Sequence, residues 1–450
     1  MRAIFASLLV VSYVGCTEVK VPGAWQLELV SRDWDGEARG RSTALFHALS
    51  GDGRVVSFTV VRNGSGTNPA DLENVFLHSL ESHSTRLVTL RTPDAAATAD
   101  PGINWVALSY DGSRLLFSSA SSFVPGLVNA DSNTQFYSFA SDAIEAVTVR
   151  NGALGNGTSE YGLALSDDGA TAVFPSLARN LTNDEPPVGP VRLIISDANG
   201  LRLLVSSSGQ LPDGTSFDPD VAADGRRFTF VSLAQNLHTA HNGLPPGCTV
   251  WAASPPVDDL RKIYFLDGRT GNPEIRLLSG SPDGSHLGSR NCAHAESFTP
   301  RISADGNFVV FLSEAVDLAS DGTVGSTSTL NLYQYSVETS DTRLLASNAG
   351  PLGLDVSGDG RYVVFGASME SGMSQVFSID THRSMDDPSR LRLVSANSQG
   401  TPANEDCALP HISNDGRVIT FASSATNLAD GAGGAGDVFD IFASRLLPIE

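Results

Sequence analysis

The stretch ISADGNFVVFLS (302–313) decides the fold of this chain, because its pattern occurs six more times in the sequence. The pattern reads approximately apolar-Ser-x-Asp-Gly-x-x-apolar-x-Phe. Each of the seven copies contains one Asp-Gly pair at its centre: Asp52-Gly53, Asp111-Gly112, Asp168-Gly169, Asp224-Gly225, Asp305-Gly306, Asp359-Gly360 and Asp415-Gly416. Successive Asp residues are 59, 57, 56, 81, 54 and 56 positions apart. A repeat of roughly 40–60 residues built from short strands is typical of propeller blades, so the sequence predicts an all-β fold, a seven-bladed β-propeller.

Each copy predicts an innermost strand, a tight turn and a second strand. In the last copy these are residues 409–413, the turn Asn414-Asp415-Gly416, and residues 418–421. Glycine adopts positive φ at little cost, and aspartate can accept hydrogen bonds from its own backbone, so Asp-Gly favours the turn. One phenylalanine recurs in every second strand, and we expect its ring in the core between blades: Phe58, Phe117, Phe174, Phe230, Phe311, Phe365 and Phe421.

The last blade lacks a fourth strand of its own, because only residues 443–450 follow its third strand at 437–442. The segment WQLELVS (25–31) matches the pattern of LRLVS (391–395), the fourth strand of the blade before. We therefore expect residues 25–31 to pair beside residues 437–443. This pairing would complete the last blade, remove an open sheet edge and make residues 25–450 one propeller domain.

Composition and charge narrow the class of protein. The chain has 450 residues, among them 43 Gly and 23 Pro, and a formal net charge of −21. Such an acidic balance argues against nucleic acid and against anionic membrane surfaces, which bind basic patches. No apolar run approaches the roughly 20 residues that a transmembrane helix needs. We expect a monomer whose only link to a membrane is a lipid anchor.

The N-terminus predicts an export signal over residues 1–16. Arg2 supplies the positive start, residues 3–14 are apolar, and Val14-Gly15-Cys16 resembles the cleavage box of bacterial lipoproteins. Lipidation of Cys16 would place the protein at the outer membrane, whereas ordinary signal cleavage would leave it periplasmic or secreted; an uncleaved anchor is the third alternative. Residues 17–24 are then a short linker.

The interval of 81 residues places an insertion in the fourth blade's span, at about 238–299. Its two loops, 238–260 and 280–299, should lie on the same face because strand direction alternates. Cys248 is in the first loop and Cys292 in the second, and an exported protein meets an oxidising compartment, so the sequence predicts a disulfide between them. Cys407 is expected on that face as a free or intermolecular thiol, unless it displaces one of the other two.

Motifs of catalysis are missing from the sequence. There is no G-x-S-x-G, H-E-x-x-H, C-x-x-C or phosphate-binding loop. Several histidines fall on the insertion face, and spacing alone leaves a metal site from distant loops open, but polar surface loops explain them equally. The sequence predicts no catalytic residue, no metal and no cofactor.

One constellation points to a binding site. The residue four positions before each turn Asp lies on an innermost strand, and these residues are Ala48, Ala107, Ala164, Asp220, Arg301, Asp355 and His411. Three consecutive blades thus carry alanine and the next four carry charged or polar side chains. Because innermost strands surround the central channel, its mouth should be small on one side and polar on the other. The two interpretations are a ligand site and an inter-blade ion-pair chain Asp220–Arg301–Asp355.

The copies at 302–313 and 412–421 resemble the TolB-type, WD-like propeller repeat of bacterial envelope and secreted proteins. The resemblance covers residues 25–445 and implies the propeller fold, but it says little about activity. It leaves two functions open. The first is a non-enzymatic scaffold that binds an envelope protein or a glycan. The alternative is a lyase or hydrolase acting on acidic saccharides at the channel mouth, although fold does not imply function.

Overall fold

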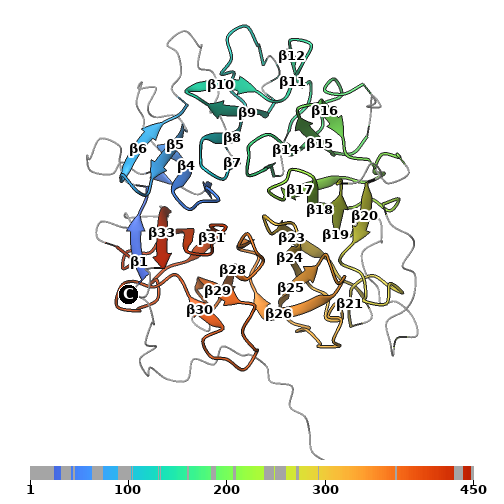
Figure 1. Cartoon of the computed structure of the whole chain (residues 1–450), viewed down its shortest axis with the longest axis vertical. Coiled ribbons are helices and arrows are strands. Elements are labelled where there is room, and N and C mark those ends of the chain that lie inside the picture. The colour runs from blue at the N-terminus through green and yellow to red at the C-terminus, as the bar shows by residue number, and fades with distance from the viewer. Residues whose placement is uncertain are drawn as a thin grey trace, which may run out of the picture.

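The computed structural model shows a ring of small sheets around a central axis (Figure 1). It describes residues 25–446 except 32–41, 44–45, 63–73, 90–102, 104, 130, 132, 160–161, 184–188, 206–208, 238–247, 249–259, 270–272, 292, 370–371 and 430–438. The predictions made for Cys16, for the linker 17–24 and for Cys292 therefore lie outside the described residues.

The first four blades follow the chain in order. Blade 1 contains β2 (Ser42–Thr43), β3 (His47–Leu49), β4 (Val55–Arg62), β5 (Asn74–Ser79) and β6 (Ser84–Leu87). Blade 2 contains β7 (Val106–Leu108), β8 (Arg114–Ser119), β9 (Gln135–Ala140) and β10 (Ala143–Ala146). Blade 3 contains β13 (Ala164–Leu165), β14 (Ala172–Ser176), β15 (Arg192–Asp197) and β16 (Gly200–Leu203). Blade 4 contains β17 (Ser216–Val221), β18 (Arg227–Ser232), β19 (Lys262–Asp267) and β20 (Glu274–Leu277).

Three further blades complete the ring. Blade 5 contains β23 (Ser297–Ile302), β24 (Phe308–Ser313), β25 (Leu330–Ser336) and β26 (Thr342–Ala349). Blade 6 contains β27 (Leu354–Val356), β28 (Tyr362–Ser368), β29 (Ser374–Asp380) and β30 (Leu391–Leu393). Blade 7 contains β31 (Cys407–Ile412), β32 (Val418–Ser423), β33 (Asp440–Leu446) and, at its outer edge, β1 (Trp25–Leu29). Two small hairpins stand outside the blades: β11 (Val149–Arg150) with β12 (Ala153–Leu154), and β21 (Ser289–Arg290) with β22 (Ala293–His294).

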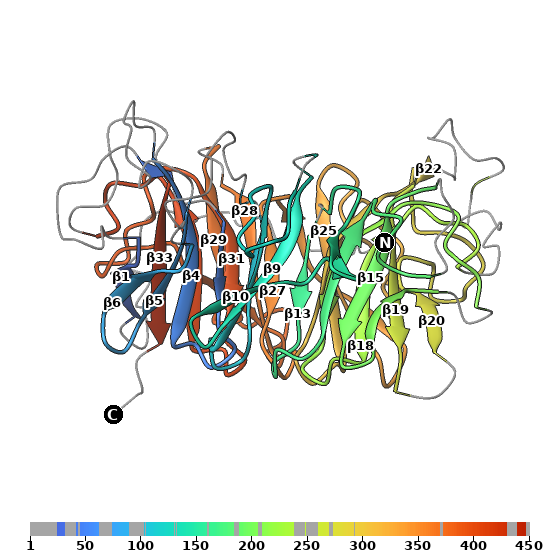
Figure 2. The same ribbon diagram turned by 90° about the horizontal axis from the view of Figure 1, so that it is seen from above.

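The innermost strands touch one another in chain order around the axis, and β3 of blade 1 also touches β31 of blade 7. Figure 2 shows the resulting flat disc from its side, with β22 at the upper face. The described residues contain strands and turns but no helix. This part of the chain accordingly has no helix that is long and apolar enough to cross a membrane. The predicted seven-bladed propeller is the observed fold.

The N-terminal strand β1 lies antiparallel to β33, with Trp25 opposite Leu446 and Leu29 opposite Phe442. The Val30 N–H continues the ladder by donating to the carbonyl of Ile441 at 2.8 Å. This register differs by three residues from the expected pairing with 437–443. The reason lies in β33, which keeps its register with β32 beyond Phe442 as far as Arg445, so the third strand begins later and runs further than the sequence suggested.

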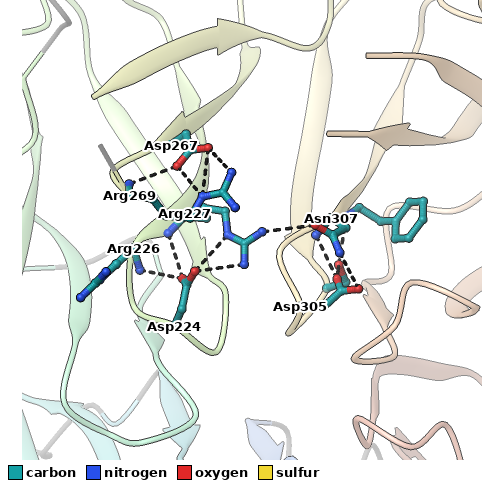
Figure 3. Close-up of polar contacts among 9 residues, drawn as sticks. Asp224, Arg226, Arg227, Asp267, Arg269, Asp305 and Asn307 are labelled. Carbon is teal, nitrogen blue, oxygen red and sulfur yellow. Dashed lines mark hydrogen bonds and ion pairs between the residues drawn. The ribbon is translucent and has the colours of Figure 1, made fainter. Parts of the chain in front are cut away.

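The repeated turn has the chemistry that its residues predicted. In blade 5, the hydroxyl of Ser303 donates to the carboxylate of Asp305 at 2.5 Å, the backbone N–H of Asn307 donates to the same oxygen at 2.9 Å, and Gly306 has φ of +69°. Blade 4 has Ala222 in place of the serine. There the guanidinium of Arg227 replaces it and donates to Asp224 (Nε to Oδ2, 3.1 Å; Figure 3). Its Nη1 also donates to Asn307 Oδ1 at 3.3 Å, which links blades 4 and 5.

The core lies between blades. The described buried apolar residues form seven clusters, each shared by two neighbouring blades. The seven recurring phenylalanines are all buried, as predicted. Most of them stack on an aromatic ring of the third strand in the same blade; the rings of Phe311 and Tyr333, for example, have centroids 5.8 Å apart and planes inclined by 26°. Such stacked pairs add to the hydrophobic stabilisation of each blade.

The insertion of blade 4 contains an additional copy of the repeated turn. The hydroxyl of Ser281 donates to Asp283 at 2.7 Å, and Gly284 has φ of +69°. This turn precedes the hairpin β21–β22 rather than a blade, so the sequence of the turn alone does not define a blade. Cys407 is a free thiol whose Sγ lies 3.2 Å from the hydroxyl of Ser423. Because Cys407 is fully buried, a cysteine of another molecule could not reach it to form a disulfide. The pairing of Cys248 with Cys292 stays a prediction.

Candidate ligand site at the channel mouth

Three innermost strands bulge next to the predicted site position. The pairing of β17, β23 and β31 with the second strand shifts register just before Asp220, Arg301 and His411. Each bulge consists of a non-glycine residue with positive φ followed by proline; the pairs are Asp218-Pro219, Thr299-Pro300 and Leu409-Pro410, with φ of +46°, +49° and +52°. A residue before proline normally adopts an extended conformation, and positive φ costs a non-glycine residue about 1–2 kcal/mol. The same strained backbone therefore recurs in three blades along one arc of the channel.

Arg301 is the central cation of this arc. Its Nη1 donates to Asp218 Oδ1 at 3.0 Å and to the carbonyl of Pro300 at 2.6 Å. Burial lowers the pKa of Arg301, but the nearby carboxylates of Asp218, Asp220 and Asp355 outweigh that effect and raise it, so the guanidinium stays charged. Both hydrogen bonds that join Arg301 to described residues leave from Nη1.

Asp220 and Asp355 perform the same structural task in two different blades. Asp220 Oδ2 accepts the backbone N–H of Ile302 in the next blade at 2.8 Å. Asp355 Oδ2 accepts the N–H of Ile412 in its own next blade at 2.9 Å. Each carboxylate also accepts the N–H of the residue that follows it, at 3.0 and 2.8 Å. These two side chains therefore bridge neighbouring blades through backbone groups.

This geometry corrects one expectation. The ion-pair chain Asp220–Arg301–Asp355 is not built from direct contacts, since the carboxylate that bonds Arg301 is Asp218, which the pattern analysis did not select. Asp220 and Asp355 act on Arg301 electrostatically without bonding it. A signal for Asp218 existed in the sequence, because an Asp-Pro pair two residues before a site position is unusual in a strand.

His411 brings blade 1 into the site. Its Nδ1 lies 3.6 Å from Asp355 Oδ2, and its ring meets the ring of His47 edge-on with centroids 4.8 Å apart. His47 lies on β3, one residue before the alanine that the pattern selected, and it is buried. The structure thus groups Asp220, Arg301, Asp355 and His411 on one arc, and it adds Asp218 and His47. The alanines Ala48, Ala107 and Ala164 hold the equivalent positions in blades 1 to 3.

A hydrogen bond bridges the channel at the end where the Asp-Gly turns of the blades lie. Asn414 of blade 7 donates through Nδ2 to Asp167 Oδ2 of blade 3 at 2.8 Å. At least two blades separate these two residues on either side of the ring, so the bond reaches across the channel instead of joining neighbouring blades. Burial raises the pKa of Asp167, which the hydrogen bond from Asn414 partly offsets. A ligand at the polar arc would therefore enter from the insertion face.

Burial raises the pKa of Asp220 from 3.8 to about 7; Arg301 and the N–H of Ile302 lower it, and Asp355 raises it further. At pH values between 3.8 and about 7, Asp220 keeps its proton in the folded protein but has released it in the unfolded chain. The corresponding stabilisation is present at low pH and is lost as the pH rises through 7.

Asp220→Asn is accordingly expected to flatten the pH dependence of stability. Thermal unfolding of the wild type between pH 5 and pH 8 should show the midpoint falling by a few degrees more than that of the variant, because the neutral amide cannot ionise. Parallel curves for the two proteins would contradict a raised pKa at Asp220.

No protein-family profile matches this sequence, and no curated protein matches it. Similar solved structures include an oligogalacturonate lyase from Vibrio parahaemolyticus, 11% identical, which aligns over 95% of this chain and 98% of its own with a TM-score of 0.54. An oligogalacturonate lyase in complex with manganese is 13% identical over 94% of each chain, with a TM-score of 0.55. TolB from Acinetobacter baumannii is 15% identical over 74% of this chain and 62% of its own, with a TM-score of 0.41. Identities this low show a shared fold alone: the chain is a seven-bladed β-propeller whose structural neighbours include TolB proteins.

Proposed function

We propose that this protein is an exported, non-enzymatic binding scaffold of the cell envelope that holds a saccharide at its channel mouth. The observation that carries the proposal is the asymmetry of the ring, where one arc presents Arg301, Asp218 and His411 opposite a row of alanines. A few fixed polar groups can orient a ligand. Ala48 and Ala164 are themselves buried in the cores between blades, so the ligand contacts would come from the polar arc. The bridge between Asp167 and Asn414 spans the other end of the channel, where the Asp-Gly turns lie.

The chemistry of the arc suits hydroxyl groups. A guanidinium offers only donors and a carboxylate offers only acceptors, whereas a sugar hydroxyl both donates and accepts. Arg301 and Asp218 are 25% and 23% exposed at their side chains and already bonded to each other, so their positions are fixed before a ligand arrives. Fixed polar groups of this kind reduce the entropy that binding costs.

The charge of the arc favours a neutral saccharide over an acidic one. Three carboxylates, those of Asp218, Asp220 and Asp355, surround the single guanidinium of Arg301. Even with Asp220 near half-protonation at neutral pH, the arc carries no excess of positive charge. A chain of uronate groups would meet repulsion here as well as from the net charge of −21.

Saccharide binding is tested with residues 17–450 on an array of neutral and N-acetylated oligosaccharides, followed by calorimetry on the best binder. Arg301→Ala should weaken binding at least tenfold, and Arg301→Lys should restore little of it, because lysine cannot reproduce the planar donors. Arg417→Ala is the matched control, since Arg417 is a largely exposed arginine in the turn of blade 7. Unchanged affinity in Arg301→Ala would contradict the proposed site, and retention of an envelope protein without any saccharide would favour a protein partner instead.

The location in the envelope follows from the export signal proposed for residues 1–16. A lipid on Cys16 would anchor the protein at the outer membrane, and cleavage without lipidation would leave it periplasmic or secreted. Detergent partitioning of the wild type and of Cys16→Ser in the native host distinguishes the two, because only a lipidated protein moves from the detergent phase to the aqueous phase upon substitution.

A lyase or hydrolase on acidic saccharides is the second candidate. The raised pKa of Asp220 favours it, since acid–base catalysis needs a group that titrates near neutral pH. The imidazole Nδ1 of His411 also lies 3.6 Å from the carboxylate of Asp355 on the same arc. Among the described residues of the arc, no three metal-ligating side chains lie within reach of one ion, and the manganese named for one of the similar lyase structures is not carried over to this chain. Incubation with oligogalacturonate separates the two candidates: formation of an unsaturated, ultraviolet-absorbing product that Asp220→Asn abolishes would establish the enzyme.

A further inference from the structure

A second cluster of reactive side chains lies at the outer rim, far from the channel, where the N-terminal strand meets blade 1. Glu28 comes from β1, His78 from β5, and His83 from the turn between β5 and β6. Glu28 Oε1 lies 2.7 Å from His83 Nδ1 and 3.3 Å from His78 Nε2. The three ligand atoms are all within 4.8 Å of one another.

The two histidines present the correct nitrogens. His78 is 3% exposed, and its Nδ1 bonds the hydroxyl of Thr85 at 2.8 Å, which turns Nε2 toward Glu28. A second hydrogen bond of this kind orients the ring in most histidine metal sites. The side chain of His83 is 62% exposed and leaves the cluster open to solvent. Its backbone has φ of +53°, a conformation that a histidine adopts at a cost, and this conformation aims Nδ1 at Glu28.

The charges around the cluster are nearly balanced. Burial raises the pKa of Glu28, but the hydrogen bonds from His78 and His83 outweigh it, so the pKa of this carboxyl is lowered and it carries a negative charge. Arg445 is the nearby cation, with Nη2 at 3.8 Å from Glu28 Oε2. Its Nη2 also donates to the carbonyl of Leu80.

We propose that Glu28, His78 and His83 form a zinc site that fastens the N-terminal strand to the first blade. Two imidazoles and one carboxylate are the ligand set of open zinc sites, in which water takes the fourth position. Zn–N and Zn–O bonds of about 2.0–2.1 Å place neighbouring ligand atoms roughly 3.3 Å apart. In this cluster two of the separations are 2.7 and 3.3 Å, and all three lie within 4.8 Å. Because Glu28 lies on β1 at the edge of blade 7 and both histidines lie in blade 1, the ion would join the last blade to the first.

The proposal is tested by calorimetric titration of zinc into residues 17–450 after dialysis against a chelator, together with the visible spectrum of the cobalt(II) form. We expect one equivalent of zinc, a rise in the midpoint of thermal unfolding, and the absorption of a four-coordinate cobalt centre. His83→Asn should lower the affinity at least tenfold while the metal-free protein melts as the wild type does, because asparagine tolerates positive φ. Thr85→Val should weaken binding less.

His382→Asn is the matched control, an exposed histidine in a turn of blade 6, and it should bind zinc as the wild type does. Equal affinity in His83→Asn and the wild type, or a cobalt spectrum typical of six-coordinate aqueous ions, would overturn the site. The result is independent of the channel mouth, because Arg301→Ala should retain full zinc binding even if every saccharide test fails.

Discussion

Deletion of residues 17–32 is expected to abolish the cooperative thermal unfolding transition of the protein. It should not leave a shorter chain that folds normally. The deletion removes β1, whose five residues pair with β33, and also Val30 and Ser31. The Ser31 hydroxyl donates to Asp440 Oδ1 at 2.8 Å and accepts the N–H of Ile441 at 3.0 Å, so these two hydrogen bonds at the end of the strand pair are lost as well. β33 would become an unpaired edge strand, which exposes backbone groups and invites aggregation.

The deletion also removes buried apolar side chains, because the segment of β1 and Val30 contributes to two cores. Leu29 is 1% exposed and packs in the cluster between blades 6 and 7, whereas Val30 is 0% exposed and packs in the cluster between blades 7 and 1. Burial of each such side chain is worth about 1.5–3 kcal/mol. Their joint loss is a large part of the 5–15 kcal/mol that stabilises a typical folded domain. It is concentrated at the one junction where the ends of the chain must meet.

The measurement is thermal unfolding followed by circular dichroism and tryptophan fluorescence. A deletion that ends at residue 24 is the matched control, since it leaves β1 whole, and it should melt as the full chain does. Val30→Asp should reproduce much of the effect of the long deletion by placing a charge in the closing core. A normal melting transition in the deletion of residues 17–32 would show that the ring does not depend on β1.

Structural features that depend on residues close together in the sequence were predictable here, whereas features that depend on contacts between distant segments were less so. The turn Asp305-Gly306 was predictable because its hydrogen bonds are local, and the closure by residues 25–31 was predictable because a strand pattern was missing at one end and present at the other. The register of β33 was not predictable to the residue. It is set by the pairing of Phe421 with Phe442, and the repeat pattern does not show where a strand ends.

The candidate site shows the same division. The offset of four residues before the turn Asp located Arg301 and His411 on one arc, since equal positions in successive blades surround one axis. It missed Asp218, because the bulge that turns this residue toward Arg301 depends on backbone conformation. It also could not reveal the partnership of Glu28 with His78, which exists only after the two ends of the chain have met.

The turn glycines have a second requirement that the repeat alone does not disclose. A Cβ atom added to any one of the seven would lie within 3.0 Å of the preceding blade, always at the residue three positions after that blade's turn Asp. The contacts are Gly112 with Val55, Gly169 with Arg114, Gly225 with Thr171, Gly306 with Arg227, Gly360 with Phe308, Gly416 with Tyr362 and Gly53 with Val418. The last contact closes the circle from blade 7 to blade 1. Each glycine thus serves its own turn and the seam to its neighbour.

Gly360→Ala should therefore destabilise the protein far more than an ordinary glycine substitution. The new methyl group would lie 2.2 Å from Cδ2 and 2.5 Å from Cγ of Phe308, and φ of +73° adds strain of about 1–2 kcal/mol. Overpacking of this kind costs a further ~1–3 kcal/mol. Gly322→Ala is the matched control, because its φ of +77° gives similar strain but an added Cβ meets nothing within 4 Å.

A double-mutant cycle in denaturant separates strain from the clash at the blade seam. In the background of Phe308→Ala the whole ring is gone and only Cβ remains, 2.9 Å from the new methyl, so Gly360→Ala should cost little more there than Gly322→Ala does. The coupling between Gly360 and Phe308 should then be about 1–3 kcal/mol in free energy of unfolding. If Gly360→Ala costs the same with and without the ring of Phe308, the glycine is needed for its turn alone, and the contact with the preceding blade contributes nothing to its selection.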